Sequence, residues 1–254
     1  MPTVPGRRKF IKQLTALSVL PVLEAPLPHT ADSNTGKEGE GWTFLFQGDS
    51  ITDGNRTRNN DWNHVMGHGY QYIIASKLWY ELPEKGFHFL NRGISGNKVT
   101  DLAARWQQDT LDLKPDVLSI LIGINDVSAG LKGNKEFTAD QYEQGYRSLL
   151  EQTLRQLPTV RFVLCEPFVL PAGGVKDRWD AYKTEVDQRR MIVHKLSREY
   201  KGILVEFQAA FNKALSKAPA PYWIWDGVHP MPAGHELMAR EWLRQVGRQL
   251  KFIR

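Results

Sequence analysis

The chain has 254 residues, 41% of them hydrophobic, which is enough for one sizeable core but a tight fit for two full domains. The formal net charge of +5 comes mostly from the first 31 residues, where Arg7, Arg8, Lys9 and Lys12 face only Glu24, so the body of the chain lacks the clustered basic face of a general nucleic-acid binder. A single cysteine, Cys165, excludes an internal disulfide and a multi-cysteine zinc site.

The N-terminal segment has the pattern of an export signal. Arg7 and Arg8 precede an apolar run at residues 14–23 that is too short to span a bilayer as a helix. This order resembles a twin-arginine signal, and a disordered basic tail is the alternative interpretation. Residues 30–41, TADSNTGKEGEG, are polar and rich in glycine and predict a linker. We therefore expect residues 1–40 to be a signal peptide and linker, and the mature protein to be periplasmic or extracellular without stable membrane insertion.

Strand and helix patterns alternate after the linker. Short runs rich in β-branched and aromatic residues predict strands, and apolar residues at helical spacing predict helices. In chain order we expect a strand at 42–47, a helix at 69–82, a strand at 87–93, a helix at 98–113, a strand at 116–124, a helix at 138–157, a strand at 161–170, a helix at 176–200, a strand at 202–207, and helices at 209–218 and 233–250.

Two of these elements carry further information. The run DVLSILIGI at 116–124 is apolar throughout, which is typical of a central parallel strand that is buried on both faces. Thr138 is a plausible N-cap for the helix that follows. Strands separated by helices imply right-handed crossovers. We therefore predict a flavodoxin-like three-layer α/β/α sandwich with a mostly parallel five-stranded sheet.

In such sheets, ligands bind beyond the carboxyl ends of the strands, so the residues that follow each strand are the candidates for chemistry. Polar residues suited to one reaction occur at four of these positions. They are Gly48, Asp49 and Ser50 after the first strand, Gly93, Ser95 and Asn97 after the second, Gly123, Asn125 and Asp126 after the third, and Asp226 and His229 beyond the fifth.

The segments GDS, NRGISG, GIND and DGVH resemble the four signature blocks of the GDSL-like, or SGNH, family of hydrolases. Each block is weak alone, but the four occur in order across the chain. The resemblance implies that residues 41–254 form one hydrolase domain that needs no metal and no organic cofactor. It assigns Ser50 as the nucleophile and Asp226 and His229 as the acid and base. The oxyanion donors it implies are the backbone N–H groups of Ser50 and Gly93 and the side-chain amide of Asn125.

Elementary chemistry supports these roles. A serine hydroxyl is a weak nucleophile until a base removes its proton, and histidine can gain and lose a proton near neutral pH. Asp226 precedes His229 by three residues, so a single turn can bring the two side chains to the same face. The carboxylate would then fix the imidazole tautomer and stabilise the imidazolium. Gly93 has no side chain to obstruct its N–H, and the Asn125 amide is a donor.

Ser95 is a competing nucleophile. The segment GISGN has Asn97 where the G-x-S-x-G elbow of α/β-hydrolases needs glycine, and Asp226 and His229 are closer together in sequence than the acid and base of those enzymes. A substrate-lining or structural role is therefore the better prediction for Ser95. His64 and His68 are four residues apart, as metal ligands can be, but no third ligand is obvious.

Several other residues are candidates for lining the substrate site. Trp223 and Trp225 flank the predicted catalytic loop, and Trp62 follows the first block, where aromatic faces could stack on sugar rings. Asp49 has a second interpretation, in which its carboxylate accepts backbone N–H groups and holds the turn rigid. The candidates for lining are Asp49, Trp62, His64, Asn97, Trp223 and Trp225.

These patterns predict a secreted serine esterase that hydrolyses short-chain carbohydrate esters, O-acetyl groups first among them, through an acyl-enzyme. The alternatives are a lysophospholipase, thioesterase or arylesterase, or an inactive carbohydrate-binding module. We expect a small-molecule or glycan ester as the substrate and no nucleic-acid partner. The oligomeric state is not readable from the sequence, and fold alone does not identify the acyl or alcohol group.

Overall fold

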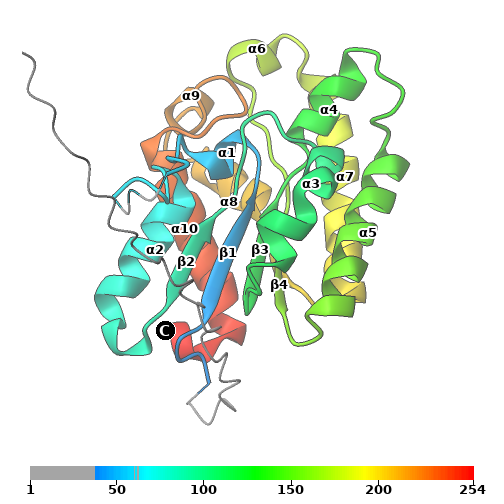
Figure 1. The fold of residues 1–254 in the computed structure, drawn as a ribbon. Coiled ribbons are helices and arrows are strands. Elements are labelled where there is room, and N and C mark those ends of the chain that lie inside the picture. The colour runs from blue at the N-terminus through cyan, green and yellow to red at the C-terminus, as the bar shows by residue number, and fades with distance from the viewer. Residues whose placement is uncertain (1–37, 60, 62) are drawn as a thin grey trace, which may run out of the picture. The chain divides into compact units, whose positions relative to one another are not determined.

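The computed structural model describes residues 38–59, 61 and 63–254. Five parallel strands form one sheet with the order β2-β1-β3-β4-β5, which is the flavodoxin-like order (Figure 1). The strands are β1 (Thr43–Gly48), β2 (His88–Asn91), β3 (Val117–Leu121), β4 (Arg161–Cys165) and β5 (Ile203–Val205). The predicted α/β class and five-stranded sheet are confirmed, and the sheet is parallel throughout rather than mostly parallel.

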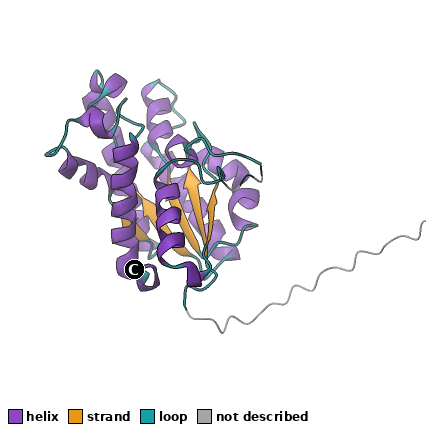
Figure 2. Cartoon of the chain, turned by 90° about the vertical axis from the view of Figure 1, so that its left-hand side faces the viewer, coloured by secondary structure: helices purple, strands orange, loops and turns teal. Residues whose placement is uncertain are grey.

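Helices cover both faces of this sheet (Figure 2). One core cluster joins the sheet to α2 (Tyr70–Glu81), α8 (Phe207–Ala214) and α10 (Pro232–Gln249). The other joins it to α3 (Val99–Trp106), α5 (Ala139–Gln156) and α7 (Trp179–Glu199). The expected three layers are therefore present. The N-terminal signal and linker that the sequence predicts lie almost wholly outside the described residues.

Short helices gather at the carboxyl edge of the sheet, at the top of Figure 1. These are α1 (Ser50–Asp53), α4 (Ile124–Leu131), α6 (Gly173–Lys176) and α9 (Ala220–Trp223). Single turns also follow α2 (Pro83–Lys85), α3 (a π-helical turn, Gln107–Leu111) and α10 (Lys251–Ile253). The predicted strand-end residues thus lie at or next to helix ends on this edge of the sheet.

The central strand β3 is apolar apart from one hydrogen-bonded hydroxyl. All five residues of β3 are buried, as the continuous apolar run predicts. Ser119 lies among them, and its Oγ accepts a hydrogen bond from Trp242 Nε1 at 3.1 Å. Cys165 is buried beside it, and burial raises the pKa of this thiol to about 12, so it is a core residue.

Two element boundaries show how local chemistry decides the outcome. Thr138 caps α5 as predicted, because its Oγ1 accepts from Gln141 N while the Gln141 side chain accepts from Thr138 N. The strand predicted at 161–170 ends at Cys165. Pro167 cannot donate to a neighbouring strand, so the apolar residues after it are buried as an irregular segment. Within the described part of the chain, no helix is both long and apolar enough to cross a membrane.

Candidate active site

The turn after β1 holds Ser50 at the first position of α1. Asp49 caps this helix, and its Oδ1 accepts a hydrogen bond from Ile51 N at 3.0 Å. Gly48 has no room for a side chain, because a Cβ would lie 2.4 Å from both Leu121 O and Thr52 Oγ1. The order Gly-Asp-Ser therefore has a physical reason: close approach to β3, a helix cap, and a hydroxyl at the edge of the sheet.

Ser50, His229 and Asp226 form a continuous hydrogen-bonded relay. Ser50 Oγ lies 2.9 Å from His229 Nε2, and His229 Nδ1 lies 2.7 Å from Asp226 Oδ2. A neutral imidazole that donates Nδ1–H to the carboxylate leaves Nε2 to accept the serine proton. The relay reaches solvent, because 43% of the His229 side chain is exposed. The structure thus brings together three residues that lie at opposite ends of the sequence.

Asp226 is held as an ionised acceptor. Burial would raise the pKa of Asp226, but hydrogen bonds from the His229 ring and from the backbone N–H groups of His229 and Val228 outweigh it and hold the pKa below its ordinary value. Both backbone bonds go to Oδ1, which leaves Oδ2 for the imidazole. This division fixes the orientation of the carboxylate relative to the ring.

The loop that carries the acid and base is closed on itself. Ile224 and Pro230 pair across it, and Met231 N donates to Trp223 O at 2.8 Å. Gly227 has a φ of 94° and its carbonyl accepts from Leu170 N, which ties the loop to the segment after β4. Backbone contacts that close the loop therefore fix the positions of Asp226 and His229.

Backbone and amide donors surround the serine. Asn125 is the second residue of α4, and its Nδ2 donates to Asn97 O at 3.1 Å, which leaves one of its two N–H groups available. No described residue accepts a hydrogen bond from Ser50 N or Gly96 N. Gly96 has a φ of 83° and open space around its α-carbon. It was not among the predicted donors, although it lies within the same block and next to Asn97.

The Gly93 N–H is engaged elsewhere, contrary to the sequence-based expectation. It donates to Asn91 Oδ1 at 2.9 Å in a buried position. A Cβ on Gly93 would lie 2.4 Å from Asp53 N, so this glycine is required for packing against α1. Gly93 and Gly96 both follow β2, and the sequence does not show which of their N–H groups donates to the Asn91 side chain. For this reason Gly93 was assigned as the oxyanion donor from the sequence.

Ser95 has no histidine partner among the residues that the structure describes. Its Oγ and its N–H both donate to Asp53 Oδ2, at 3.2 and 3.0 Å. His64 lies in the exposed loop after α1, where its Nδ1 is 2.7 Å from Asp61 Oδ2. Among the residues that the structure describes, no three His, Cys, Asp or Glu side chains are grouped to hold a metal ion.

The aromatic candidates differ in position. Trp225, which directly precedes Asp226, is 59% exposed, and Tyr222 is 56% exposed. Trp223 is partly buried, its Nε1 donates to Ala218 O, and its ring packs edge-on against Tyr222. Trp62 lies outside the described residues. Asn97 is tied by its side chain to Arg105 Nε and by its carbonyl to Asn125.

Asp49 cannot line an open pocket, because it is only 1% exposed. Burial raises its pKa to about 7, although the Ile51 N–H and the nearby His229 oppose this shift. The folded state therefore keeps a proton on Asp49 over a pH range in which the unfolded chain has lost it. Stability from this group is full below the ordinary pKa of 3.8 and is lost as pH rises through about 7.

Replacing Asp49 by asparagine should remove this pH dependence, because the amide stays neutral and can still accept from Ile51 N. As pH rises from about 5 to about 8.5, wild type should lose about 3 kcal/mol of unfolding free energy that Asp49→Asn keeps. Thermal unfolding at the two pH values measures this, with the exposed Asp140→Asn as the matched control. An equal offset at both pH values would show that Asp49 is ionised throughout.

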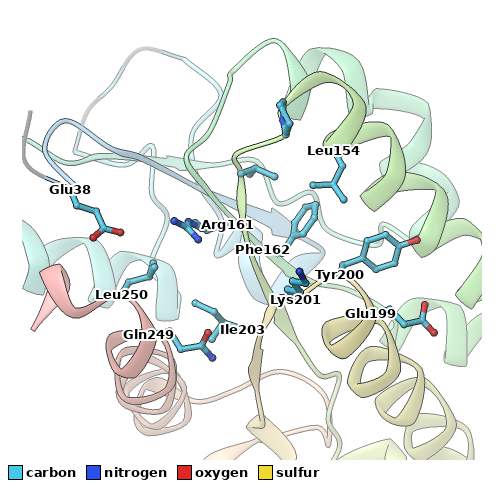
Figure 3. Close-up of a pocket in the computed structure, with 12 residues that line it drawn as sticks. Glu38, Leu154, Arg161, Phe162, Glu199, Tyr200, Lys201, Ile203, Gln249 and Leu250 are labelled. Carbon is cyan, nitrogen blue, oxygen red and sulfur yellow. The ribbon is translucent and has the colours of Figure 1, made fainter. Parts of the chain in front are cut away.

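A separate cavity of about 440 Å³ lies at the other end of the sheet (Figure 3). Arg161 and Phe162 contribute from the start of β4, and Ile203 from the start of β5. Gln249 and Leu250 close it from the end of α10. Because Ser50 follows the carboxyl end of β1, this cavity belongs to the opposite edge from the relay.

Known proteins are similar to this chain in sequence and in fold. The chain matches the GDSL-like lipase/acylhydrolase family over residues 46–237. An acetylxylan esterase from Geobacillus stearothermophilus is 38% identical over 218 residues, which are 83% of this chain and 96% of that protein. Its crystal structure aligns with a TM-score of 0.74 over 84% of this chain and 97% of its own. A Parabacteroides merdae protein named as a GDSL-like lipase is 42% identical, with a TM-score of 0.78 over 82% of this chain and 96% of its own.

The Geobacillus esterase also offers a comparison of spacing. Its variants that are described as catalytic mutants replace one serine, one aspartate and one histidine by alanine. The serine and histidine are 179 positions apart, and the aspartate precedes the histidine by three. Ser50, Asp226 and His229 have the same separations in this chain.

Proposed function

Because this chain belongs to the GDSL-like lipase/acylhydrolase family and is a carboxylic ester hydrolase, we propose that it removes short acyl groups, O-acetyl groups above all, from carbohydrates. The hydrogen-bonded relay of Ser50, His229 and Asp226 at the carboxyl edge of the sheet is the observation that carries this proposal. The similarity to an acetylxylan esterase supports the carbohydrate part.

In the proposed mechanism, His229 Nε2 takes the proton from Ser50 Oγ as the oxygen attacks the ester carbonyl. The tetrahedral intermediate collapses, the C–O bond to the sugar breaks, and the imidazolium returns its proton to the departing sugar hydroxyl. Water then attacks the acetyl-enzyme, again with His229 as the base. Acetate leaves, and Ser50 regains its proton. Asp226 stays ionised and stabilises the imidazolium in both halves.

The oxyanion would be held by the N–H groups of Ser50 and Gly96 and by the Asn125 side chain. We prefer Gly96 to Gly93 because the Gly93 N–H already has a buried acceptor. The bond from Asn125 to Asn97 O fixes the amide before substrate arrives. Preorganised donors of this kind stabilise charge that develops only in the transition state.

Aromatic side chains beside the relay suit a sugar substrate. Trp225 directly precedes Asp226 and is exposed, and the exposed Tyr222 lies three residues earlier in the same segment, so both rings offer flat apolar surfaces to a ligand. A lysophospholipase, thioesterase or arylesterase could use the same relay, so the acyl and alcohol groups are assigned here by the relative and by these rings. An inactive binding module has no use for a complete serine, histidine and aspartate relay.

Export is part of the proposal. The paired arginines and short apolar run in residues 7–23 carry it, and they lie outside the described residues. Cell fractionation of the full chain tests it, with Arg7 and Arg8 both changed to lysine as the comparison, since retention of that variant in the cytoplasm is the expected result.

A panel of esters tests the substrate assignment. We expect p-nitrophenyl acetate and acetylated xylo-oligosaccharides to be hydrolysed with much higher kcat/KM than p-nitrophenyl esters of long acyl chains. Release of acetate from the oligosaccharides is measured directly by NMR. A clear preference for long acyl chains or for lysophospholipids would contradict the carbohydrate assignment while leaving the esterase chemistry intact.

A further inference from the structure

A second pocket, of about 460 Å³, lies between the loop after α1 and the loop after β2 and is lined by three arginines. Arg56 and Arg58 come from the loop after α1, and Arg92 follows β2. The pocket also contains one carboxylate, Asp109. Nothing in the proposed acyl transfer uses these guanidinium groups.

Arg56 is a buried cation with unused donors. It is only 8% exposed, and its Nε donates to Gly93 O at 3.0 Å. No described residue accepts a hydrogen bond from its two terminal nitrogens, and no described carboxylate forms a salt bridge with it. A guanidinium has five N–H donors and is costly to bury without acceptors. The two terminal nitrogens of Arg56 have no described acceptor but keep some contact with solvent, so they are available to bind an anion in the pocket that this residue lines.

The two acids in this region are already engaged. Asp53 Oδ2 accepts from Arg58 at 2.6 Å and from Ser95. Asp109 Oδ2 is 2.9 Å from Arg105. Arg56 and Arg92 therefore remain without a carboxylate partner among the described residues, and the pocket keeps an excess of positive charge.

The titration of Arg56 agrees with this charge excess. Burial lowers its pKa to about 10, and the neighbouring charges of Arg58 and Arg92 lower it further than Asp53 and Asp109 can offset. An anion in the pocket would relieve both effects. Arg92 has donors to spare, since its only described side-chain hydrogen bond goes to Asn91 O at 3.2 Å.

This pocket shares its wall with the nucleophile turn. Ile94 lines it, and Ile94 N donates to Gly48 O, two residues before Ser50. Asp53, which Arg58 binds, ends the helix that Ser50 begins. The loop that contributes Arg92 and Ile94 continues to Gly96 and Asn97, beside the Asn125 amide. We take a glycan bound at Ser50 to reach the pocket along this loop.

We propose that Arg56 and Arg92 form a subsite for a carboxylate on the glycan, so that the enzyme prefers acetylated sugars next to a uronic acid residue. The proposal rests on the proposed function, because it takes the substrate to be a glycan ester. Arginine suits this task, since its planar fork matches the two oxygens of a carboxylate.

Binding to the Ser50→Ala variant tests the subsite without turnover. Calorimetry would compare an unbranched acetylated xylo-oligosaccharide with one of equal length that has a single glucuronosyl branch. We expect about tenfold tighter binding of the acidic glycan, which is about 1.4 kcal/mol, because its carboxylate accepts charge-assisted hydrogen bonds that the unbranched glycan cannot form. Adding Arg92→Gln should abolish the preference, and adding the exposed Arg155→Gln should preserve it.

Arg56→Gln should also abolish the preference, and its thermal unfolding shows whether the fold survives loss of the contact to Gly93 O. If the Arg56→Gln variant does not fold, the Arg92→Gln variant alone tests the subsite. Equal affinity for both glycans, in a wild-type enzyme that deacetylates both, would overturn the subsite and leave the proposed function standing. Arg92-dependent binding of inorganic phosphate with no preference for the acidic glycan would likewise overturn it. Loss of all glycan deacetylation, with the acidic preference retained, would refute the proposed function instead.

Discussion

Replacing Ser50 by alanine is expected to lower kcat by about 10⁵–10⁶-fold, because the reaction then has no nucleophile and His229 has no hydroxyl to activate. The residual rate would come from the oxyanion donors and from substrate binding. KM should change little, since the hydroxyl contributes little to holding the ground state. Initial rates with p-nitrophenyl acetate and with acetylated xylo-oligosaccharides measure both constants.

Ser95→Ala is the matched control. Ser95 lies 45 residues after Ser50 in the sequence, at the same edge of the sheet. Its hydroxyl donates to Asp53, and no described histidine lies within hydrogen-bond distance of it. Its loss should leave kcat within a few-fold of wild type, since the Asp53 carboxylate keeps the Ser95 N–H and Arg58 as partners. If Ser95→Ala abolished turnover and Ser50→Ala did not, the assigned nucleophile would be wrong.

Changing Asp226 to asparagine should lower kcat by about 10⁴-fold. Oδ1 can still accept from Val228 N and His229 N, so the loop should keep its geometry. The amide nitrogen then faces His229 Nδ1 and donates to it. That reverses the tautomer, places a proton on Nε2, and removes the acceptor that Ser50 needs.

The loss should depend on pH, since hydroxide can take the serine proton when His229 cannot. We expect the kcat of Asp226→Asn to rise at alkaline pH toward the wild-type value. Asp187→Asn is the control, because Asp187 pairs with Lys183 and Arg190 on the exposed side of α7 and should have no effect on kcat. A loss of tenfold or less in Asp226→Asn would show that the carboxylate does not fix the tautomer.

The sequence predicts the positions of the relay well because each member is tied to a local rule. Ser50 follows a buried strand through Gly48 and Asp49, and both neighbours have structural reasons to be those residue types. Asp226 and His229 are three residues apart in a loop that closes through short-range backbone contacts. Parallel strands then bring the two segments to one edge of the sheet.

Long-range competition for hydrogen bonds is what the sequence does not reveal. The sequence does not distinguish Gly93 from Gly96 as a donor. Only the fold shows that the Gly93 N–H donates to the Asn91 side chain. Asp49 is likewise a plausible lining residue until burial between α1 and the sheet becomes visible. These outcomes depend on which residues, distant in sequence, contact each polar group in the fold. A single sequence does not give the distances between such residues.

The arginine pocket illustrates the same limit. Arg56 and Arg58 share one short segment with Asp53, but Arg92 and Asp109 come from elsewhere in the chain, so the sequence alone does not show that these groups meet. Tertiary contacts decide that Asp53 and Asp109 are paired while Arg56 is not. The start of α5, in contrast, follows a local cap and is predicted closely, as Thr138 shows. The strand predicted at 161–170 is wrong at its end, because it stops at Cys165, before Pro167.

Covalent trapping of the nucleophile is the most direct test of the account. A fluorophosphonate that reacts with activated serines is added to the wild-type enzyme, and peptide mass spectrometry locates the adduct. The account predicts complete inactivation with one adduct, on Ser50, and no adduct in His229→Ala. An adduct on Ser95, or full activity after Ser50 has been labelled, would contradict it.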